Sequence, residues 1–263
     1  MGFIETNDLR YFQFDSFKGQ DVFHAVLTRH GGASAGPFAS LNTGGTVGDD
    51  PQAVVANHEK IYQTFGYDYY SRFDVWQVHG TDILCADGPR SPETPHPKAD
   101  GILTDREDVT LFMRFADCVP ILLLDPVRRV IGIIHAGWQG TARQIARVAV
   151  EKMGACYGSR PGDLLAGIGP SICPQCYEVG PEVVRAFQRS YGGRAEVYFS
   201  HGKNGHFHLD LWTANRDTLH MAGVTRIEES RLCTACHLDD WYSHRAEHGR
   251  TGRFGVLLTL GKA

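Results

Sequence analysis

A thiol and a carboxyl group stand side by side immediately before a strongly apolar stretch of the sequence. In Phe115-Ala-Asp-Cys-Val-Pro-Ile-Leu-Leu-Leu124, Asp117 and Cys118 precede a run typical of a buried strand. Because burying an unpaired carboxylate costs several kcal/mol, Asp117 is expected to have a hydrogen-bonding or catalytic role. Cys118 taken alone is more typical of a core thiol, since free cysteine is among the most buried residue types.

Two histidines at the ends of apolar segments change the interpretation of Cys118. His79 closes Val75-Trp-Gln-Val-His-Gly80, and His135 closes Val130-Ile-Gly-Ile-Ile-His135. Each alone is more typical of a structural histidine, but one thiolate and two imidazoles together suit zinc, with copper the less suitable ion. Three protein ligands leave a fourth position for water or substrate, so His79, Cys118 and His135 predict a catalytic metal site.

The residues after His135 suggest an anion site. Gly137 and Gly140 would let backbone amides approach a ligand where a helix is predicted to begin at Thr141, with Arg143 in its first turn. An ordinary strand-to-helix turn explains the same glycines equally well. Phosphate binding by this turn therefore stays one of two interpretations.

Further polar residues are candidates for binding phosphate or substrate. Arg29 precedes a Gly-Gly pair, and Arg245 lies in the loop Ser243-His-Arg-Ala-Glu-His-Gly-Arg-Thr-Gly-Arg253. Gln77 would share one face of a strand with His79, because strand side chains alternate. Loop arginines are usually only solvated, so spacing alone does not choose among them.

Four of the seven cysteines form two CxxC pairs, Cys173-Pro-Gln-Cys176 and Cys233-Thr-Ala-Cys236. Residues 177–232 separate the pairs, far more than the roughly 15 to 20 residues of a usual zinc ribbon. A redox pair would need a strand-to-helix junction of a small βαβ domain, which leaves that option open but weak. We interpret these cysteines as structural thiols, since the odd cysteine number does not suggest a disulfide framework.

Hydrophobic patterning predicts strands mixed with helices. Strand-like runs rich in β-branched and aromatic residues occur at 22–28, 74–79, 110–115, 119–124, 130–135, 164–168, 196–200 and 254–260. Four helices are predicted: one capped by Asp50 and stopped at Gly66, one capped by Thr141, one opened by Pro181, and one running from Asp210 to Gly223. Without regular strand-helix alternation, an α+β class with large mixed sheets is expected.

Composition excludes several functions. The 263 residues carry a formal net charge of -4, which disfavours a protein that neutralises nucleic-acid phosphates. No apolar run approaches the length of a membrane span, and no secretory signal is visible, so a cytoplasmic protein is expected. No linker or repeat divides the sequence, and we expect one domain over residues 1–263.

Nearly the whole chain resembles the YfiH/YlmD family. The shared segments include Thr28-Arg-His-Gly-Gly32, Ser40-Leu-Asn-Thr43, Gln77-Val-His-Gly80, Ala99-Asp-Gly101, Ala116-Asp-Cys-Val-Pro-Ile121, His135-Ala-Gly-Trp138, Gly169-Pro-Ser171, Cys176-Tyr-Glu-Val179 and Thr251-Gly-Arg253. Members of this family have long been labelled multicopper polyphenol oxidases or laccases and are now regarded as purine nucleoside-processing enzymes.

The resemblance implies a four-layer αββα fold and a zinc site at His79, Cys118 and His135. Asp117 is the nearest acid to this trio in the sequence. It implies phosphorolysis of adenosine, inosine, guanosine and S-methyl-5'-thioadenosine, together with deamination of adenosine. Asn42, in one of the shared segments, joins the candidates for binding substrate. The partners would be a purine nucleoside and phosphate, and a monomer or a weak dimer is expected.

The sequence departs from the family pattern in two places. The usual HAGWRG segment has Gln139 in place of its arginine, and the common GPCCYEV segment reads Cys173-Pro-Gln-Cys-Tyr-Glu-Val179. Without a cation at position 139, Arg143 or another arginine would have to bind phosphate.

Alternative functions remain open at this point. The family also suggests a hydrolase that removes a wrongly incorporated amino acid from peptidoglycan precursors. A partner-binding domain stabilised by metal is less favoured, because structural zinc usually has four protein ligands. Copper oxidase chemistry is the least favoured, since one Cys/His/His trio cannot assemble several coppers.

Overall fold

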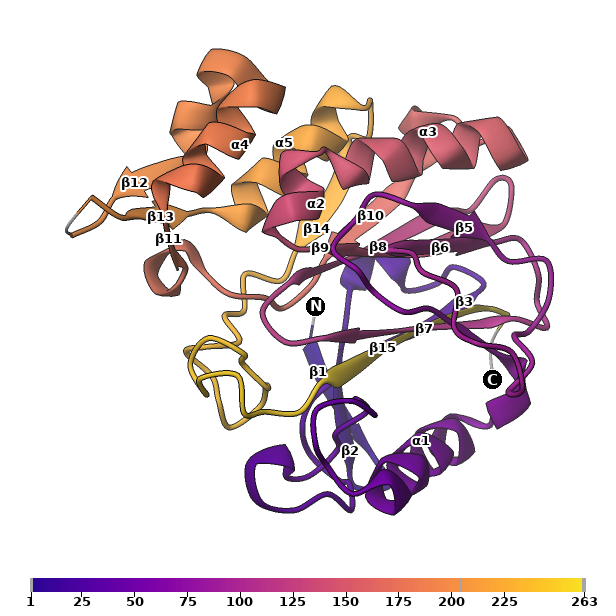
Figure 1. The fold of residues 1–263 in the computed structure, drawn as a ribbon. Helices are drawn as coiled ribbons and strands as arrows, with labels where there is room; N and C mark the ends of the chain where they lie inside the picture. The colour runs from indigo at the N-terminus through magenta and orange to yellow at the C-terminus, as the bar shows by residue number, and fades with distance from the viewer. Residues whose placement is uncertain (1, 204, 262–263) are drawn as a thin grey trace.

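Two six-stranded β-sheets lie face to face in the computed structural model, which describes residues 2–203 and 205–261 (Figure 1). The first sheet has the order β1 (Gly2–Thr6), β2 (Leu9–Gln13), β3 (Val22–Leu27), β15 (Phe254–Leu260), β7 (Thr110–Phe115) and β4 (Arg72–Asp74). The second has the order β14 (Arg226–Glu229), β10 (Leu165–Ile168), β8 (Val119–Asp125), β9 (Val130–Ala136), β6 (Gly101–Thr104) and β5 (Ile83–Cys85). Each sheet mixes parallel and antiparallel pairs.

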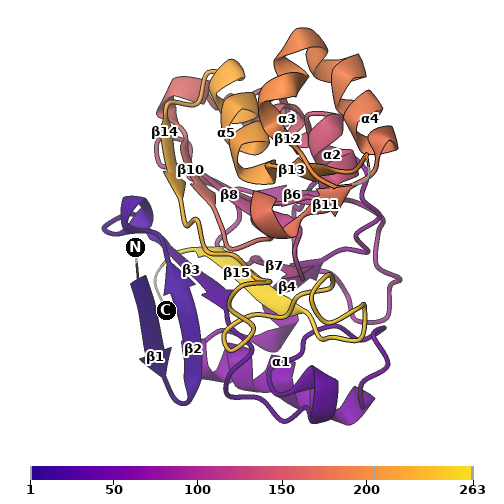
Figure 2. The ribbon, with the colours of Figure 1, turned by 90° about the vertical axis from the view of Figure 1, so that its left-hand side faces the viewer.

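Helices cover the outer faces of both sheets, as Figure 2 shows. Helix α1 (Pro51–Phe65) lies on the first sheet, and α2 (Trp138–Ala142), α3 (Ile145–Tyr157) and α5 (Leu211–Met221) lie on the second. Helix α4 (Pro181–Tyr191) packs beside a small sheet of β11 (Glu178–Val179), β13 (Phe207–Leu209) and β12 (Phe199–His201). The order helix, sheet, sheet, helix confirms the predicted α+β fold with four layers.

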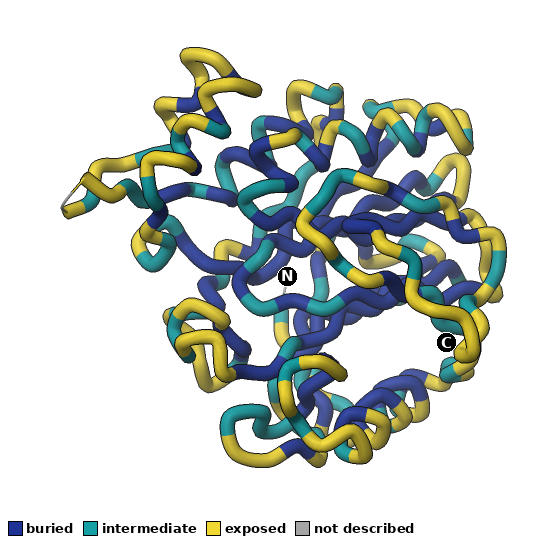
Figure 3. The backbone as a smooth tube through the Cα atoms, viewed as in Figure 1, coloured by how far each residue is buried: buried dark blue, intermediate teal, exposed yellow. Residues whose placement is uncertain are grey.

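Three apolar clusters fill the spaces between these layers. The strands of both sheets are mostly buried, as the dark blue segments in Figure 3 show. The central cluster joins residues of both sheets, among them Phe115, Leu122, Ile133 and Phe254. Because layers cover both faces of β8, all seven of its residues are buried. This explains why its sequence is continuously apolar rather than alternating.

The best-marked sequence signals match the structure residue by residue. Asp50 caps α1, its carboxylate accepting a hydrogen bond from the Gln52 amide, and Gly66 ends the helix at a φ of 73°. Asp210 caps α5 through the Thr213 amide in the same way. Strands β7 and β15 have the predicted bounds.

Three local predictions are wrong. Of the predicted strand 74–79, only Asp74 belongs to a strand, because β4 ends there. The backbone amide of His79 instead binds the carboxylate of Asp100. Most of 196–200 is a 3-10 helix, Gly192–Tyr198. Thr141 lies inside α2 with its hydroxyl bound to Asn215, and Gln144 interrupts the helical run at a φ of 59°. The hairpin of β1 and β2 was not predicted.

Within the described ranges, no helix is long and apolar enough to cross a membrane.

His24 of β3 is a buried imidazole that the fold holds in its neutral form. Its Nε2 accepts a hydrogen bond from the Phe14 amide at 2.8 Å, so this nitrogen carries no proton. Burial lowers the pKa of His24 from 6.5 to about 3, and the opposing charge of Glu228 offsets only part of this effect.

This pKa predicts a pH-dependent loss of stability. Below pH 6.5 the unfolded chain binds a proton at His24 that the folded chain does not, so the free energy of unfolding falls as the pH falls. Relative to His24→Gln, the wild type should lose about 1.5 kcal/mol between pH 6.5 and about pH 5, measured by urea unfolding. A wild-type-to-variant difference that does not change with pH would contradict a neutral His24.

Candidate metal centre and its cavity

His79, Cys118 and His135 meet at one end of the central strands β8 and β9 of the second sheet. Cys118 directly precedes β8, and His135 is near the end of the antiparallel strand β9, so their chain segments lie opposite each other. His79 arrives from the loop after β4 of the first sheet. One ligand atom from each side chain lies within 4.8 Å of the other two. The donor set of one sulfur and two imidazole nitrogens could hold a metal ion of the zinc type.

The buried carboxylate of Asp100 holds both histidine segments in place. Its Oδ1 accepts hydrogen bonds from His135 Nδ1 at 2.8 Å and from the His79 amide at 2.9 Å. Its Oδ2 accepts from the amides of Val78 and Gly80. Because Nδ1 of His135 is bound in this way, Nε2 is left for a metal, the usual arrangement of carboxylate, histidine and metal.

Gly137 packs directly against the side chains of His79 and Cys118. A Cβ atom at this position would lie 2.9 Å from His79 Cδ2 and 3.0 Å from Cys118 Sγ. Any larger residue would push the ligand side chains apart. The glycine of the His135-Ala-Gly137 segment therefore serves the packing of the ligand trio.

The trio favours a thiolate. Burial alone would raise the pKa of Cys118, but the charge and hydrogen bonding of His135, helped by His79, lower it to about 6. Burial would lower the pKa of His135, but the thiolate and the hydrogen bond to Asp100 raise it to about 9. Thiolate is the form in which cysteine binds a metal.

The side chain of Asp117 makes different contacts from that of its neighbour Cys118. Its backbone lies in the left-handed region, with a φ of 82°, so the alternation of a regular strand does not apply. Its Oδ1 accepts from the Thr234 hydroxyl at 2.6 Å and its Oδ2 from the Arg245 amide at 2.7 Å. The carboxylate thus anchors the loop between β14 and β15, and it is not part of the ligand group.

The three ligands open into a cavity of about 790 Å³, within the range of roughly 300–1,000 Å³ that is usual for small-molecule sites. Its walls come from both sheets, from the start of α2 at Trp138 and from the loops around Gly44 and His244. Three arginines line it: Arg114, Arg245 and Arg253. The three candidate metal ligands and several cations therefore face the same cavity.

Arg245 and Arg253 have no carboxylate partner among the described residues. Arg253 donates to the carbonyls of Thr251 and Gly252, and Arg245 donates to the carbonyl of Glu178. Burial lowers the pKa of Arg253. Arg253 is partly buried and Arg245 is exposed. A partly buried guanidinium whose hydrogen-bond acceptors are all neutral carbonyls favours the binding of an anion, and this describes Arg253.

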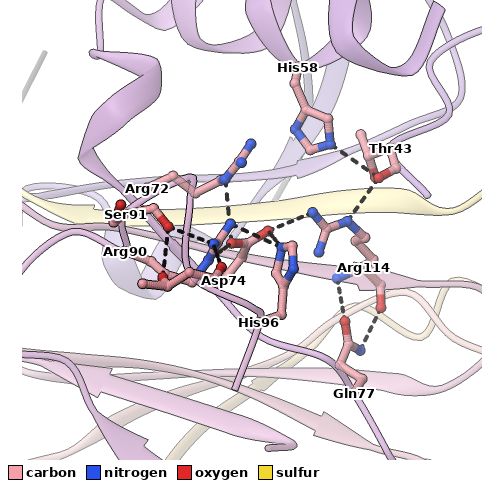
Figure 4. A network of polar contacts seen from close by, with 10 residues as sticks. Thr43, His58, Arg72, Asp74, Gln77, Arg90, Ser91, His96 and Arg114 are labelled. Carbon is pink, nitrogen blue, oxygen red and sulfur yellow. Dashed lines mark hydrogen bonds and ion pairs between the residues drawn. The ribbon is translucent and has the colours of Figure 1, made fainter. Parts of the chain in front are cut away.

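Arg114 belongs to a network centred on Asp74, drawn in Figure 4. The buried Asp74 carboxylate pairs with Arg90 at 2.8 Å, with Arg114 at 2.7 Å and with His96 at 3.1 Å. Burial would raise the pKa of Asp74, but the His96 hydrogen bond and the charges of Arg114 and Arg72 lower it well below its usual range. Several cations around one carboxylate leave a net positive charge beside the cavity.

The structure separates the other candidates from the sequence. Gln77 lines the cavity and exchanges two hydrogen bonds with the backbone of Arg114. Arg29, Asn42 and Arg143 are absent from the cavity lining. Arg29 binds backbone carbonyls and Glu247, and Arg143 is exposed at the end of α2, a helix of five residues.

Asn42 is buried behind the cavity wall and binds the backbone of residues that line the cavity. Its Oδ1 accepts from the amides of Gly44 and Arg253, and its Nδ2 donates to Asp49. It therefore holds two segments of the cavity wall together.

Two site residues were not singled out from the sequence: Asp100 and Arg114. Arg253 closes the loop 243–253 that the sequence offered for its cations, although Arg245 was the arginine chosen from it. Asp100 stands in the segment Ala99-Asp-Gly101, so its signal was present without a role attached. Arg114 interrupts the apolar strand β7 just before the Asp117-Cys118 pair. A cation inside an otherwise buried strand is the signal that could have identified it.

Comparison with known proteins identifies relatives of this chain. Residues 23–261 match the model of a family described as multi-copper polyphenol oxidoreductase laccase. The chain belongs to this family. The match confirms the resemblance to the YfiH/YlmD family, since the crystal structure of YlmD from Geobacillus stearothermophilus superposes with a TM-score of 0.92 at 34% identity, covering 98% of both chains.

Relatives in the family carry the name of an enzyme. The purine nucleoside phosphorylase YlmD of Bacillus subtilis is 37% identical over 252 residues, 93% of this chain and 90% of that protein. A purine nucleoside phosphorylase of Deinococcus radiodurans is 39% identical over 241 residues, 91% of this chain and 89% of that protein. These names indicate an enzyme of the transferase type.

The role of Asp100 gives a prediction for metal affinity. Asp100→Asn removes the charged acceptor of His135 Nδ1, so the affinity for zinc should fall about 10- to 100-fold. Titration against a chromophoric chelator measures this affinity. Asp82→Asn is the matched control, because Asp82 is exposed and only its backbone carbonyl binds Asp100.

Unchanged affinity of a folded Asp100→Asn protein would show that Asp100 does not orient the ligands. Circular dichroism of both variants establishes that they are folded.

Proposed function

We propose that this chain is a zinc-dependent purine nucleoside phosphorylase that also deaminates adenosine. The substrates would be adenosine, inosine, guanosine and S-methyl-5'-thioadenosine, each cleaved with phosphate to a free base and a pentose 1-phosphate. One observation carries the proposal: the ligand trio and the arginines without carboxylate partners line a single cavity. The names of the relatives support the same reaction class.

Zinc suits the donor set better than copper does, because thiolate and imidazole in a three-ligand site are typical of catalytic zinc. His79, Cys118 and His135 would hold the ion. When bound, zinc would supply a Lewis acid that polarises a substrate oxygen or ring nitrogen. Asp100 fixes the tautomer of His135 and the position of His79.

Arg253 is our first candidate for binding phosphate. Its guanidinium is partly buried and has neutral hydrogen-bond partners, so a bound anion would compensate its desolvation. Gly44 leaves it room, since a Cβ there would lie 2.8 Å from Arg253 Cγ. Arg245, whose guanidinium lies over the Tyr177 ring at 5.0 Å, would supply the second cation.

In phosphorolysis, the bond between C1' of the ribose and the purine nitrogen breaks, and a phosphate oxygen forms the new bond to C1'. The departing purine takes up a proton. Positive charge develops on the ribose ring, and arginines that hold the phosphate beside it keep the attacking oxygen in place. We assign Asp117 a positioning role, because both of its carboxylate oxygens are already bound to the Thr234 and Arg245 loop.

The central test compares adenosine turnover with and without phosphate. Chromatography should detect adenine only when phosphate is present, and inosine in both cases. Cys118→Ala should lose both products together with the zinc ion of this three-ligand site, whereas Cys156→Ser, which changes an exposed cysteine of α3, should keep them. Phosphate-independent release of adenine, or full turnover by a Cys118→Ala protein whose three-ligand site holds no zinc, would contradict the proposal.

A second prediction separates the arginines. Arg253→Gln should lower kcat/KM for phosphate at least about tenfold, since it removes charge-assisted hydrogen bonds, while kcat for deamination changes little. Arg143→Gln is the control on an exposed arginine and should leave both rates unchanged. Equal effects of the two substitutions would exclude Arg253 as the phosphate ligand.

A further inference from the structure

The four cysteines of the CxxC pairs come together at a second site. Cys173 and Cys176 lie in the loop between β10 and β11, and Cys233 and Cys236 lie in the loop after β14. All four sulfur atoms are within 4.8 Å of one another. None of these residues lines the cavity of the first site.

Backbone pairing holds the two loops together. Ser171 and Cys233 form a parallel bridge, in which the Ser171 amide binds the Leu232 carbonyl and the Thr234 amide binds the Ser171 carbonyl. The Cys173 amide also donates to Cys233 Sγ at 3.2 Å. A sulfur that accepts an amide hydrogen bond is stabilised as a thiolate.

We propose that these four cysteines bind a structural zinc ion. Tetrahedral zinc with a Zn–S distance of about 2.3 Å holds its sulfurs about 3.8 Å apart. The 3.4 Å between Cys176 Sγ and Cys236 Sγ, and the 4.8 Å limit for all pairs, are close to that spacing. Four protein ligands close the coordination shell, which is typical of structural rather than catalytic zinc.

Zinc at this position would brace one wall of the cavity. Cys176 is followed by Tyr177, against which Arg245 packs, and Cys233 is followed by Thr234, which binds Asp117. The ion would tie these two wall segments to each other. Its loss should therefore loosen the wall without removing a ligand of the His79, Cys118 and His135 site.

The test measures zinc content in the purified full-length protein by mass spectrometry. Cys176→Ser combined with Cys236→Ser should contain one zinc ion per chain less than the wild type and should unfold at a lower temperature. Cys156→Ser should keep the wild-type content. Cys236→His, which replaces one zinc ligand by another, should contain as much zinc as the wild type.

Cobalt gives an independent readout. Cobalt bound by the wild type and by Cys118→Ala should show the absorption of a tetrahedral tetrathiolate site, which the double serine variant lacks. Neither measurement needs nucleoside turnover, so failure of the phosphorylase proposal would leave this result intact.

Three outcomes would overturn the proposal. The first is equal zinc content in the wild type and in the double serine variant. The second is a thiol titration of denatured, unreduced protein in which four of the seven cysteines fail to react, because that would show two disulfides. The third is iron rather than zinc in the protein as purified.

Discussion

The carboxylate of Asp100 is the contact on which the first site depends. It is fully buried, and four hydrogen bonds join it to the ring of His135 and to the backbone of residues 78–80. Burial would raise the pKa of Asp100, but the bonds from His135 and the amides lower it. A single anion thus connects a loop that leaves the first sheet with a strand of the second, and the site exists where the two sheets are joined.

Carboxylate hydrogen bonds also explain two unusual backbone conformations at the site. His79 and Asp117 both have positive φ, at 58° and 82°, a region that costs a non-glycine residue about 1–3 kcal/mol. At His79 the cost is offset by the amides that Asp100 binds, and at Asp117 by the contacts of its side chain to Thr234 and Arg245. Regular strands would have pointed alternate side chains in opposite directions, whereas these turns bring both residues to the cavity.

How much of the site can be predicted from the sequence depends on how far apart along the chain the contacting residues lie. The trio of His79, Cys118 and His135 was found because each ligand adjoins an apolar run, a local signal that also predicted β8 and β9. The role of Asp100 was missed, because its bonds reach other segments of the chain. The long spacing of the CxxC pairs, which spoke against a ribbon, is bridged by the parallel pairing of β10 with β14. Only the fold brings such residues together.

Charge distribution separates the two cysteine-containing sites. The chain has a formal net charge of -4, yet Arg114, Arg245 and Arg253 meet at one cavity. A three-ligand site beside those cations has room for a bound molecule and the charge to hold an anion. Four thiolates around one zinc ion leave no position open, and their excess negative charge would repel phosphate. Under our two proposals, the same ligand chemistry would serve a reaction at one site and would support the cavity wall at the other, and the number of ligands distinguishes the two roles.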